Sequence, residues 1–156
     1  MQVINTYLTA DTFLAGYYVN HPAWSSVDAV SGVTYTRIQA SDRLGGGLGS
    51  HPNASDADDG DSMSWSFLSE TGTYTFSVLY SKYTSRGIIE FLVDDVSIGT
   101  VDMYNGSSVL NVVTDMTDIA LVEGTHTLKA LVNGKNASSS DYIMAVEWFS
   151  FTRTGA

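Results

Sequence analysis

The side chains most often used in catalysis are scattered through this sequence in no arrangement that could act together. His21, His51 and His126 are far apart, there is no cysteine, and no Gly-x-Ser-x-Gly nucleophile motif occurs. A glycosidase needs two carboxyl groups facing each other across a cleft, whereas the acids at positions 56, 58, 59 and 61 crowd one polar loop. The sequence therefore predicts a protein that is not an enzyme.

The same acidic loop superficially resembles a calcium-binding loop. The EF-hand pattern requires Gly at its sixth position and Glu at its twelfth. A loop that starts at Asp56 has Asp61 and Phe67 at those positions, so the pattern fails. A looser calcium loop remains an alternative to an ordinary solvated acidic loop, because calcium accepts oxygen ligands in varied geometries.

Two tyrosines are placed where an aromatic ring could contact a ligand. Tyr83 lies within the turn Ser81–Ser85, and Tyr104 lies beside a tight turn. A tyrosine ring has apolar faces and a polar hydroxyl, so either ring could stack on a sugar. For each tyrosine alone, ordinary surface packing is the alternative interpretation.

The elements that must position these residues are β-strands, because apolar and polar side chains alternate through much of the chain. Met63, Trp65 and Phe67 alternate with serines, and the stretch from Tyr74 to Tyr80 repeats the pattern. A period of two is typical of strands with one buried face, and no window shows a sustained helical period. Strands are predicted at residues 3–8, 33–40, 61–68, 72–80, 86–93, 96–103, 109–113, 116–122, 124–132 and 142–152.

Turn signals separate the predicted strands. Asp94–Asp95 is a predicted turn, and Asn105–Gly106 and Asn133–Gly134 are typical of tight turns whose two central residues have positive φ. Short strands at this spacing predict an all-β fold, a two-sheet antiparallel jelly-roll β-sandwich.

Composition excludes several classes of partner. The net charge is −10 with only seven Lys and Arg residues, so the cationic footprint of a nucleic-acid-binding protein is missing. No apolar run is long enough to span a membrane. Residues 1–6 have neither the basic nor the apolar region of a signal peptide, which predicts synthesis in a cytoplasm.

The first 32 residues differ from the rest because they are apolar and aromatic with weak periodicity. We interpret residues 1–32 as an N-terminal association arm and residues 33–156 as the jelly-roll domain. Exposed apolar segments often mark association surfaces. The candidate arm residues are Tyr7, Phe13, Leu14, Tyr17, Tyr18 and Trp24.

Four segments between residues 33 and 153 carry a family resemblance. They are Arg37 to Asp42, Gly60 to Trp65 with Gly72 to Phe76, Leu121 to Leu128 with its L-x-x-G-x-H-x-L pattern, and Val146 to Phe151. Together they resemble the galactose-binding-like jelly roll of the family-6 and family-35 carbohydrate-binding modules. Similar jelly rolls also occur in phage virion proteins, so the fold alone does not fix the function.

The resemblance implies a structural calcium and a sugar site, and this sequence departs from both patterns. Gln39 and Ser41 stand where the opening acids are usual, and Glu147 stands at the closing acid position. The candidate calcium residues are therefore Gln39, Asp42 and Glu147. No other cofactor is expected. The stretch after Val101 lacks the usual Trp and offers Tyr104, so the implied sugar residues are Tyr83, Tyr104 and Asn136.

Two functions follow from these observations. The first is a virion structural protein, either a capsid decoration (cement) protein or a small tail or fibre protein, located in the virion. Its partners would be capsid or tail subunits and further copies of itself, with a trimer as one arrangement that binds only the assembled shell. The alternative is a lectin-like carbohydrate-binding module that recognises a glycan through its loop aromatics.

Overall fold

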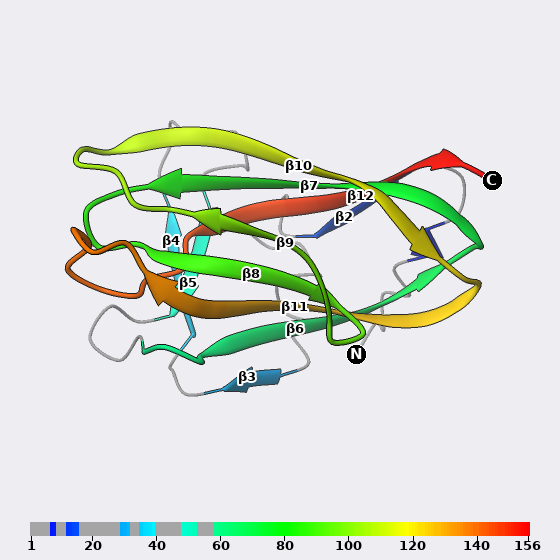
Figure 1. The fold of residues 1–156 in the computed structure, drawn as a ribbon, viewed down its shortest axis with the longest axis horizontal. Helices are drawn as coiled ribbons and strands as arrows, with labels where there is room; N and C mark the ends of the chain where they lie inside the picture. Colours follow the sequence, from blue (N-terminus) through cyan, green and yellow to red (C-terminus); the bar gives the residue numbers. More distant parts are fainter. Residues whose placement is uncertain (1–6, 9–11, 16–28, 32–34, 40–47, 53–57) are drawn as a thin grey trace.

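The computed structural model describes residues 7–8, 12–15, 29–31, 35–39, 48–52 and 58–156. Two sheets of strands pack face to face in this part of the chain (Figure 1). All the strand pairs are antiparallel except the short parallel pair of β1 and β6. The predicted two-sheet antiparallel jelly-roll sandwich is confirmed.

The first sheet has β11 near its middle and β9 at one edge. Its strands, in spatial order, are β1 (Tyr7–Leu8), β6 (Ser62–Ser69), β11 (Gly124–Lys135), β8 (Gly87–Val93) and β9 (Val96–Asp102), and β3 (Ala29–Ser31) also pairs with β6.

The second sheet has β12 at its centre and β10 at one edge. Its strands, in spatial order, are β10 (Val109–Leu121), β7 (Gly72–Lys82), β12 (Val146–Gly155), β5 (Leu48–Pro52) and β4 (Tyr35–Gln39), and β2 (Thr12–Ala15) also pairs with β12. A central place for the last strand agrees with its apolar residues on both faces.

The core lies between the two sheets and is dominated by aromatic rings. Phe76 and Phe151 of the second sheet are fully buried and lie 5.0 Å apart between ring centroids. Phe91 of the first sheet lies 5.0 Å from Phe76, and Phe67 of the first sheet lies 4.8 Å from Phe151. These inward positions are those that the period-two alternation predicts, and each fully buried ring contributes roughly 1.5–3 kcal/mol by its removal from water.

One predicted gap between strands does not exist. The strands expected at 109–113 and 116–122 form the single strand β10, whose register against β7 shifts twice. Asn111 (φ 58°) and Asp118 (φ 61°) take left-handed backbone conformations at these irregularities. A bulge adds a residue without ending the strand, so the break in alternation resembled a loop in the sequence.

The predicted turn at Asp94–Asp95 is confirmed, whereas the two predicted Asn–Gly turns are not found. Asp94 (φ 51°) and Asp95 (φ 64°) form the turn with two positive φ values, although neither is glycine. Asn133 and Gly134 lie inside β11 at an irregularity of its pairing with β8. The Asn–Gly signal at 105–106 is wrong as well, since neither residue has a positive φ. A local dipeptide preference is outweighed here by strand pairing.

Part of the predicted N-terminal arm is described, and it extends the two sheets. Tyr7 lies in β1 and pairs with Leu68. Phe13 and Leu14 lie in β2 and pair with Phe151 and Ser150 of β12. The remaining candidate arm residues, Tyr17, Tyr18 and Trp24, lie outside the described residues.

Candidate functional site

Three connections gather at one end of the sandwich, which we call the loop end. They are the β7–β8 connection (residues 83–86), the β9–β10 connection (103–108) and the β11–β12 connection (136–145). In Figure 1 they lie together at the left of the molecule. All three sugar-contacting residues predicted from the sequence fall on these connections.

Tyr83 and Tyr104 lie side by side at the loop end. They form an isolated parallel bridge, in which the Tyr83 N–H donates to the Met103 carbonyl (3.2 Å) and the Asn105 N–H donates to the Tyr83 carbonyl (3.2 Å). Paired residues present their side chains to the same face. Tyr83 is 45% exposed and Tyr104 is half-buried, so the pair is accessible to a ligand.

Asn136 is joined to this tyrosine pair through Asp102. The Tyr104 N–H donates to Oδ1 of Asp102 (2.9 Å), and Nδ2 of Asn136 donates to Oδ2 of the same carboxylate (2.9 Å). Asn136 Oδ1 accepts a hydrogen bond from the Ser138 N–H (3.0 Å). The tertiary structure therefore brings the three predicted residues together. Asp102 was missed, although an acid at a strand end just before a turn is a usable signal.

A third aromatic residue lies at the same end. Nζ of Lys135 lies 4.4 Å from the centroid of the Tyr142 ring, which is half-buried and packs against the core. No local pattern predicts this cation–π pair, because Lys135 ends β11 and Tyr142 lies in the connection that follows. It adds an ordered cation beside Asn136.

The β11–β12 connection is held against the β7–β8 connection by a buried serine. Ser139 is 7% exposed, and its hydroxyl lies 2.8 Å from the carbonyl oxygen of Arg86. The Ser140 N–H donates to the carbonyl oxygen of Thr84 (2.9 Å). Because a binding surface that is ordered in advance loses less entropy on binding, these contacts favour recognition at the loop end.

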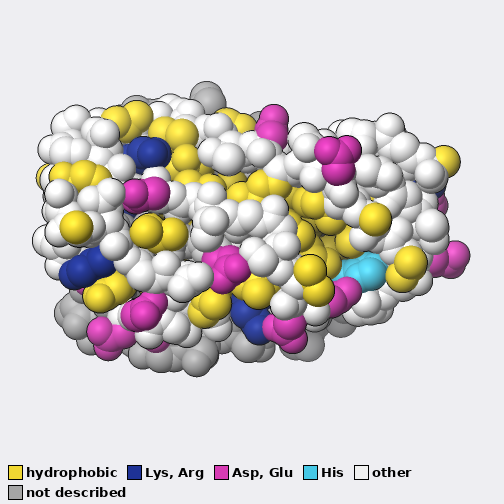
Figure 2. Space-filling view, in the orientation of Figure 1, with side chains coloured by type: hydrophobic (Ala, Val, Ile, Leu, Met, Phe, Trp, Pro, Cys, Tyr) yellow, Lys and Arg dark blue, Asp and Glu magenta, His cyan; other side chains and the backbone are white. Residues whose placement is uncertain are grey.

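A groove of about 500 Å³ lies at the other end of the sandwich, between the edges of β9 and β10. Figure 2 shows apolar side chains along its floor, with a histidine beside them. Its described lining includes Val96, Ile98, Ile119, Val122 and His126. Among the described residues, no phenol or indole ring lines the groove for a sugar to stack on.

His126 is a buried structural residue, as predicted from its place on an apolar strand face. It is 7% exposed, its Nδ1 lies 2.6 Å from Oδ2 of Asp94, and its Nε2 lies 2.8 Å from the Val122 carbonyl oxygen. Both ring nitrogens are therefore occupied by acceptors, which leaves none to act as a base.

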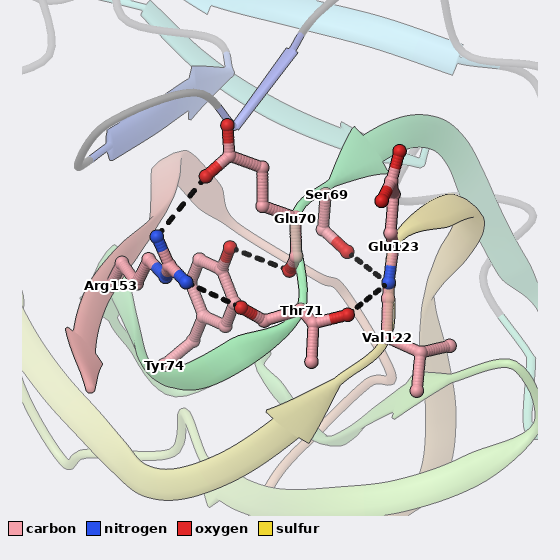
Figure 3. A network of polar contacts seen from close by, with 7 residues as sticks. All are labelled: Ser69, Glu70, Thr71, Tyr74, Val122, Glu123 and Arg153. Atoms are coloured by element: carbon pink, nitrogen blue, oxygen red, sulfur yellow. Dashed lines mark hydrogen bonds and ion pairs between the residues drawn. The ribbon is translucent and has the colours of Figure 1, made fainter. Parts of the chain in front are cut away.

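A second polar network lies at the end of the sandwich opposite the loop end, beside β12 (Figure 3). Nη1 of Arg153 lies 3.1 Å from Oε2 of Glu70, and its Nη2 donates to the Thr71 carbonyl oxygen (2.5 Å). The Tyr74 hydroxyl donates to the Glu70 carbonyl oxygen (2.9 Å), and the Glu123 N–H donates to Oγ1 of Thr71 (2.9 Å). These hydrogen bonds and the ion pair join the β6–β7 turn to β12 and to the β10–β11 turn, so their role at this end is structural.

Comparison with known proteins decides between the two functions. The sequence profile described as carbohydrate binding module (family 6) matches residues 26–153, which is most of the chain. This protein belongs to carbohydrate-binding module family 6. The modules of this family are non-catalytic, although they usually occur within enzymes.

Solved structures agree with this family in their fold. Xanthan lyase from Paenibacillus superposes with a TM-score of 0.70 and 24% identity over 82% of this chain, which spans 12% of the lyase. A family 6 module from Clostridium cellulolyticum in complex with xylose gives 0.53 and 21%, covering 81% of this chain and 92% of that module. A β-1,3-glucan-binding module from Bacillus halodurans gives 0.53 and 19%, covering 93% and 96%. No curated protein sequence matches the chain.

The prediction of a virion structural protein is therefore wrong, and so are its predicted partners, the capsid or tail subunits and further copies of the chain. The family is described as carbohydrate binding, which agrees with the alternative of a carbohydrate-binding module. The virion interpretation depended on overall organisation, and a jelly roll by itself does not distinguish the two classes.

The calcium residues implied by the family resemblance stay a prediction. Gln39 ends β4 and Glu147 follows Val146 in β12, with β5 between these strands. The side chains of both residues, and Asp42 as a whole, lie outside the described part. Among the described residues, no three His, Asp or Glu side chains are grouped to hold a metal. No helix in that part is long and apolar enough to cross a membrane.

Asp59 and Asp61 of the acidic loop bind backbone amides, whereas Asp56 lies outside the described residues. Asp61 is 6% exposed, and its Oδ2 accepts a hydrogen bond from the Asp58 N–H (2.7 Å). Oδ1 of Asp59 accepts from the Gly134 N–H (2.6 Å). These two carboxylates cap the start of β6 and the irregular end of β11, so their main contacts are with backbone amides.

Proposed function

We propose that this family 6 module binds a β-linked glycan at the loop end and carries out no reaction on it. The observation that supports this proposal is the bridge between Tyr83 and Tyr104, which places two accessible phenol rings on one face. The apolar faces of sugar rings pack well against aromatic rings, and the tyrosine hydroxyls remain free to exchange hydrogen bonds with sugar hydroxyls.

The polar groups beside the tyrosines complete a site of this kind. Asn136 still has one unused N–H and one unused lone pair, and Lys135 contributes further donors. A few polar groups around aromatic surface are typical of sites that bind small polar ligands. One similar module is in complex with xylose and another binds β-1,3-glucan, so xylans and β-1,3-glucans are the ligands to test first.

Affinity electrophoresis and calorimetry with soluble xylan and soluble β-1,3-glucan test the proposal. We expect Tyr83→Ala and Tyr104→Ala each to weaken binding at least about tenfold, which corresponds to about 1.4 kcal/mol of lost stacking. Val96→Ala, at the exposed edge of the opposite groove, is the control and should bind as the unmodified chain does.

Two results would overturn the proposal. One is binding that survives both tyrosine substitutions but is lost in Val96→Ala, which would place the ligand in the groove. The other is release of reducing ends from either glycan, which would reveal catalysis.

A further inference from the structure

Asp102 connects two parts of the proposed glycan site that are distant in sequence. It is the last residue of β9 and is half-buried. Its Oδ1 accepts from the Tyr104 N–H (2.9 Å), and its Oδ2 accepts from Nδ2 of Asn136 (2.9 Å), which lies 34 residues later. One carboxylate therefore holds both the tyrosine-bearing connection and the asparagine-bearing connection.

Each contact by itself would be an ordinary turn feature. The bond from Tyr104 to Asp102 spans two residues, and the bond from Ser138 to Asn136 does the same. Asp and Asn side chains commonly stabilise turns in this way. The hydrogen bond between the side chains of Asn136 and Asp102 is additional, because it fixes the β11–β12 connection relative to the β9–β10 connection.

We propose that Asp102 is a positioning residue of the glycan site, which sets the place of Tyr104 and the orientation of the Asn136 amide. This inference rests on the proposed function. A carboxylate only accepts hydrogen bonds, so Asn136 must turn its Nδ2 toward Asp102 and its Oδ1 toward the Ser138 N–H. The same orientation fixes which amide atoms a sugar hydroxyl can reach.

This pattern of donors and acceptors can be tested by exchanging the residues at positions 102 and 136. Asp102→Asn places one amide N–H group against another, or forces Asn136 to turn and lose its bond to Ser138. Asn136→Asp places two carboxylates against each other. In the double variant Asp102→Asn/Asn136→Asp, the new amide at 102 donates to the new carboxylate at 136. That carboxylate accepts from Ser138, and the amide oxygen at 102 accepts from Tyr104, so all three bonds return.

The four proteins are compared by calorimetric titration with soluble xylan and soluble β-1,3-glucan, with thermal unfolding measured in parallel. We expect each single variant to bind at least about tenfold more weakly, and the double variant to recover to within about threefold of the unmodified chain. Asp115→Asn is the matched control. Asp115 is an exposed aspartate of β10 that accepts a hydrogen bond from the Ser77 hydroxyl (2.6 Å) away from the loop end, and its substitution should leave binding unchanged.

The outcomes separate this inference from the proposed function. If the unmodified chain binds neither glycan, or if Tyr83→Ala binds normally, the proposed function itself fails. If the unmodified chain binds but Asp102→Asn binds equally well, the positioning role fails and the glycan site stands. If a single variant does not fold, the double variant alone tests the role of Asp102. A double variant that folds but binds glycan weakly overturns that role.

Discussion

The carboxylate of Asp94 lies 2.6 Å from Nδ1 of His126, and this contact joins the β8–β9 turn to β11. The Thr127 N–H donates to the other oxygen of Asp94 (2.9 Å). Nε2 of His126 lies 2.8 Å from the Val122 carbonyl oxygen, so each ring nitrogen lies against an oxygen atom. A buried histidine thus holds two turns and one strand together at the end opposite the proposed glycan site.

This contact predicts an acid-dependent loss of stability. Partial burial by itself raises the pKa of Asp94, but the hydrogen bonds from His126 and Thr127 and the charge of His126 outweigh burial and hold the pKa below its ordinary 3.8. A lowered pKa in the folded state stabilises the protein above pH 3.8, and this contribution is lost as the pH falls through the lowered value.

Asp94→Asn should therefore reduce the loss of thermal stability as the pH falls below about 4. The effect should be less than about 1 kcal/mol, because the Asp94 side chain is 51% exposed and solvent screens the pair. Thermal unfolding followed by circular dichroism across this range measures it. Identical acid profiles for the variant and the unmodified chain would contradict the prediction.

His126→Ala should destabilise the fold by about 2–3 kcal/mol, because it removes the contacts of the ring with Asp94 and with the Val122 carbonyl oxygen and opens a void beside Phe67. Urea unfolding measures the change. Lys129→Ala is the control on the same strand, because Lys129 pairs with the highly exposed Asp95 and should contribute less than about 1 kcal/mol. Equal losses in the two variants would show that burial of the histidine is unimportant.

Phe76→Ala should cost about 3–5 kcal/mol, since this fully buried ring contacts Phe91 of the facing sheet and Phe149 and Phe151 of its own. The midpoint of guanidinium unfolding should fall accordingly. Val113→Ala, at a half-exposed position of β10, is the control and should change stability by less than about 0.5 kcal/mol. A small loss for Phe76→Ala would mean that the facing rings can close the cavity.

Gly72→Ala should destabilise the chain by about 1–3 kcal/mol through a steric clash. A Cβ atom at this position would lie 2.5 Å from Nε of Arg153 and 2.6 Å from the Gly155 carbonyl oxygen. The clash would also disturb the ion pair of Arg153 with Glu70. Gly106→Ala is the matched control, because a Cβ atom there meets nothing closer than 4.0 Å. Thermal unfolding of the two variants should differ clearly, and equal midpoints would refute the clash.

Much of the fold was predictable because its signals are local. The alternation of apolar and polar residues located β6, β7, β8 and β11 to within a few residues, since a strand exposes successive side chains to opposite faces. The same alternation placed Tyr74 and Phe76 on the buried face of β7. Features that depend on pairing with another strand, such as the bulges of β10 and the irregularity of β11 at Asn133–Gly134, were not predictable in this way.

The candidate site was only partly predictable, for a related physical reason. The sequence by itself determined that Tyr83, Tyr104 and Asn136 lie on connections between strands, because turn residues and the ends of alternation mark such positions. Only the tertiary structure decided that the three residues meet, and that Asp102 joins them. Contacts between residues 21 to 34 positions apart follow from strand order and register, and these are set by the packing of the whole sandwich rather than by any local pattern.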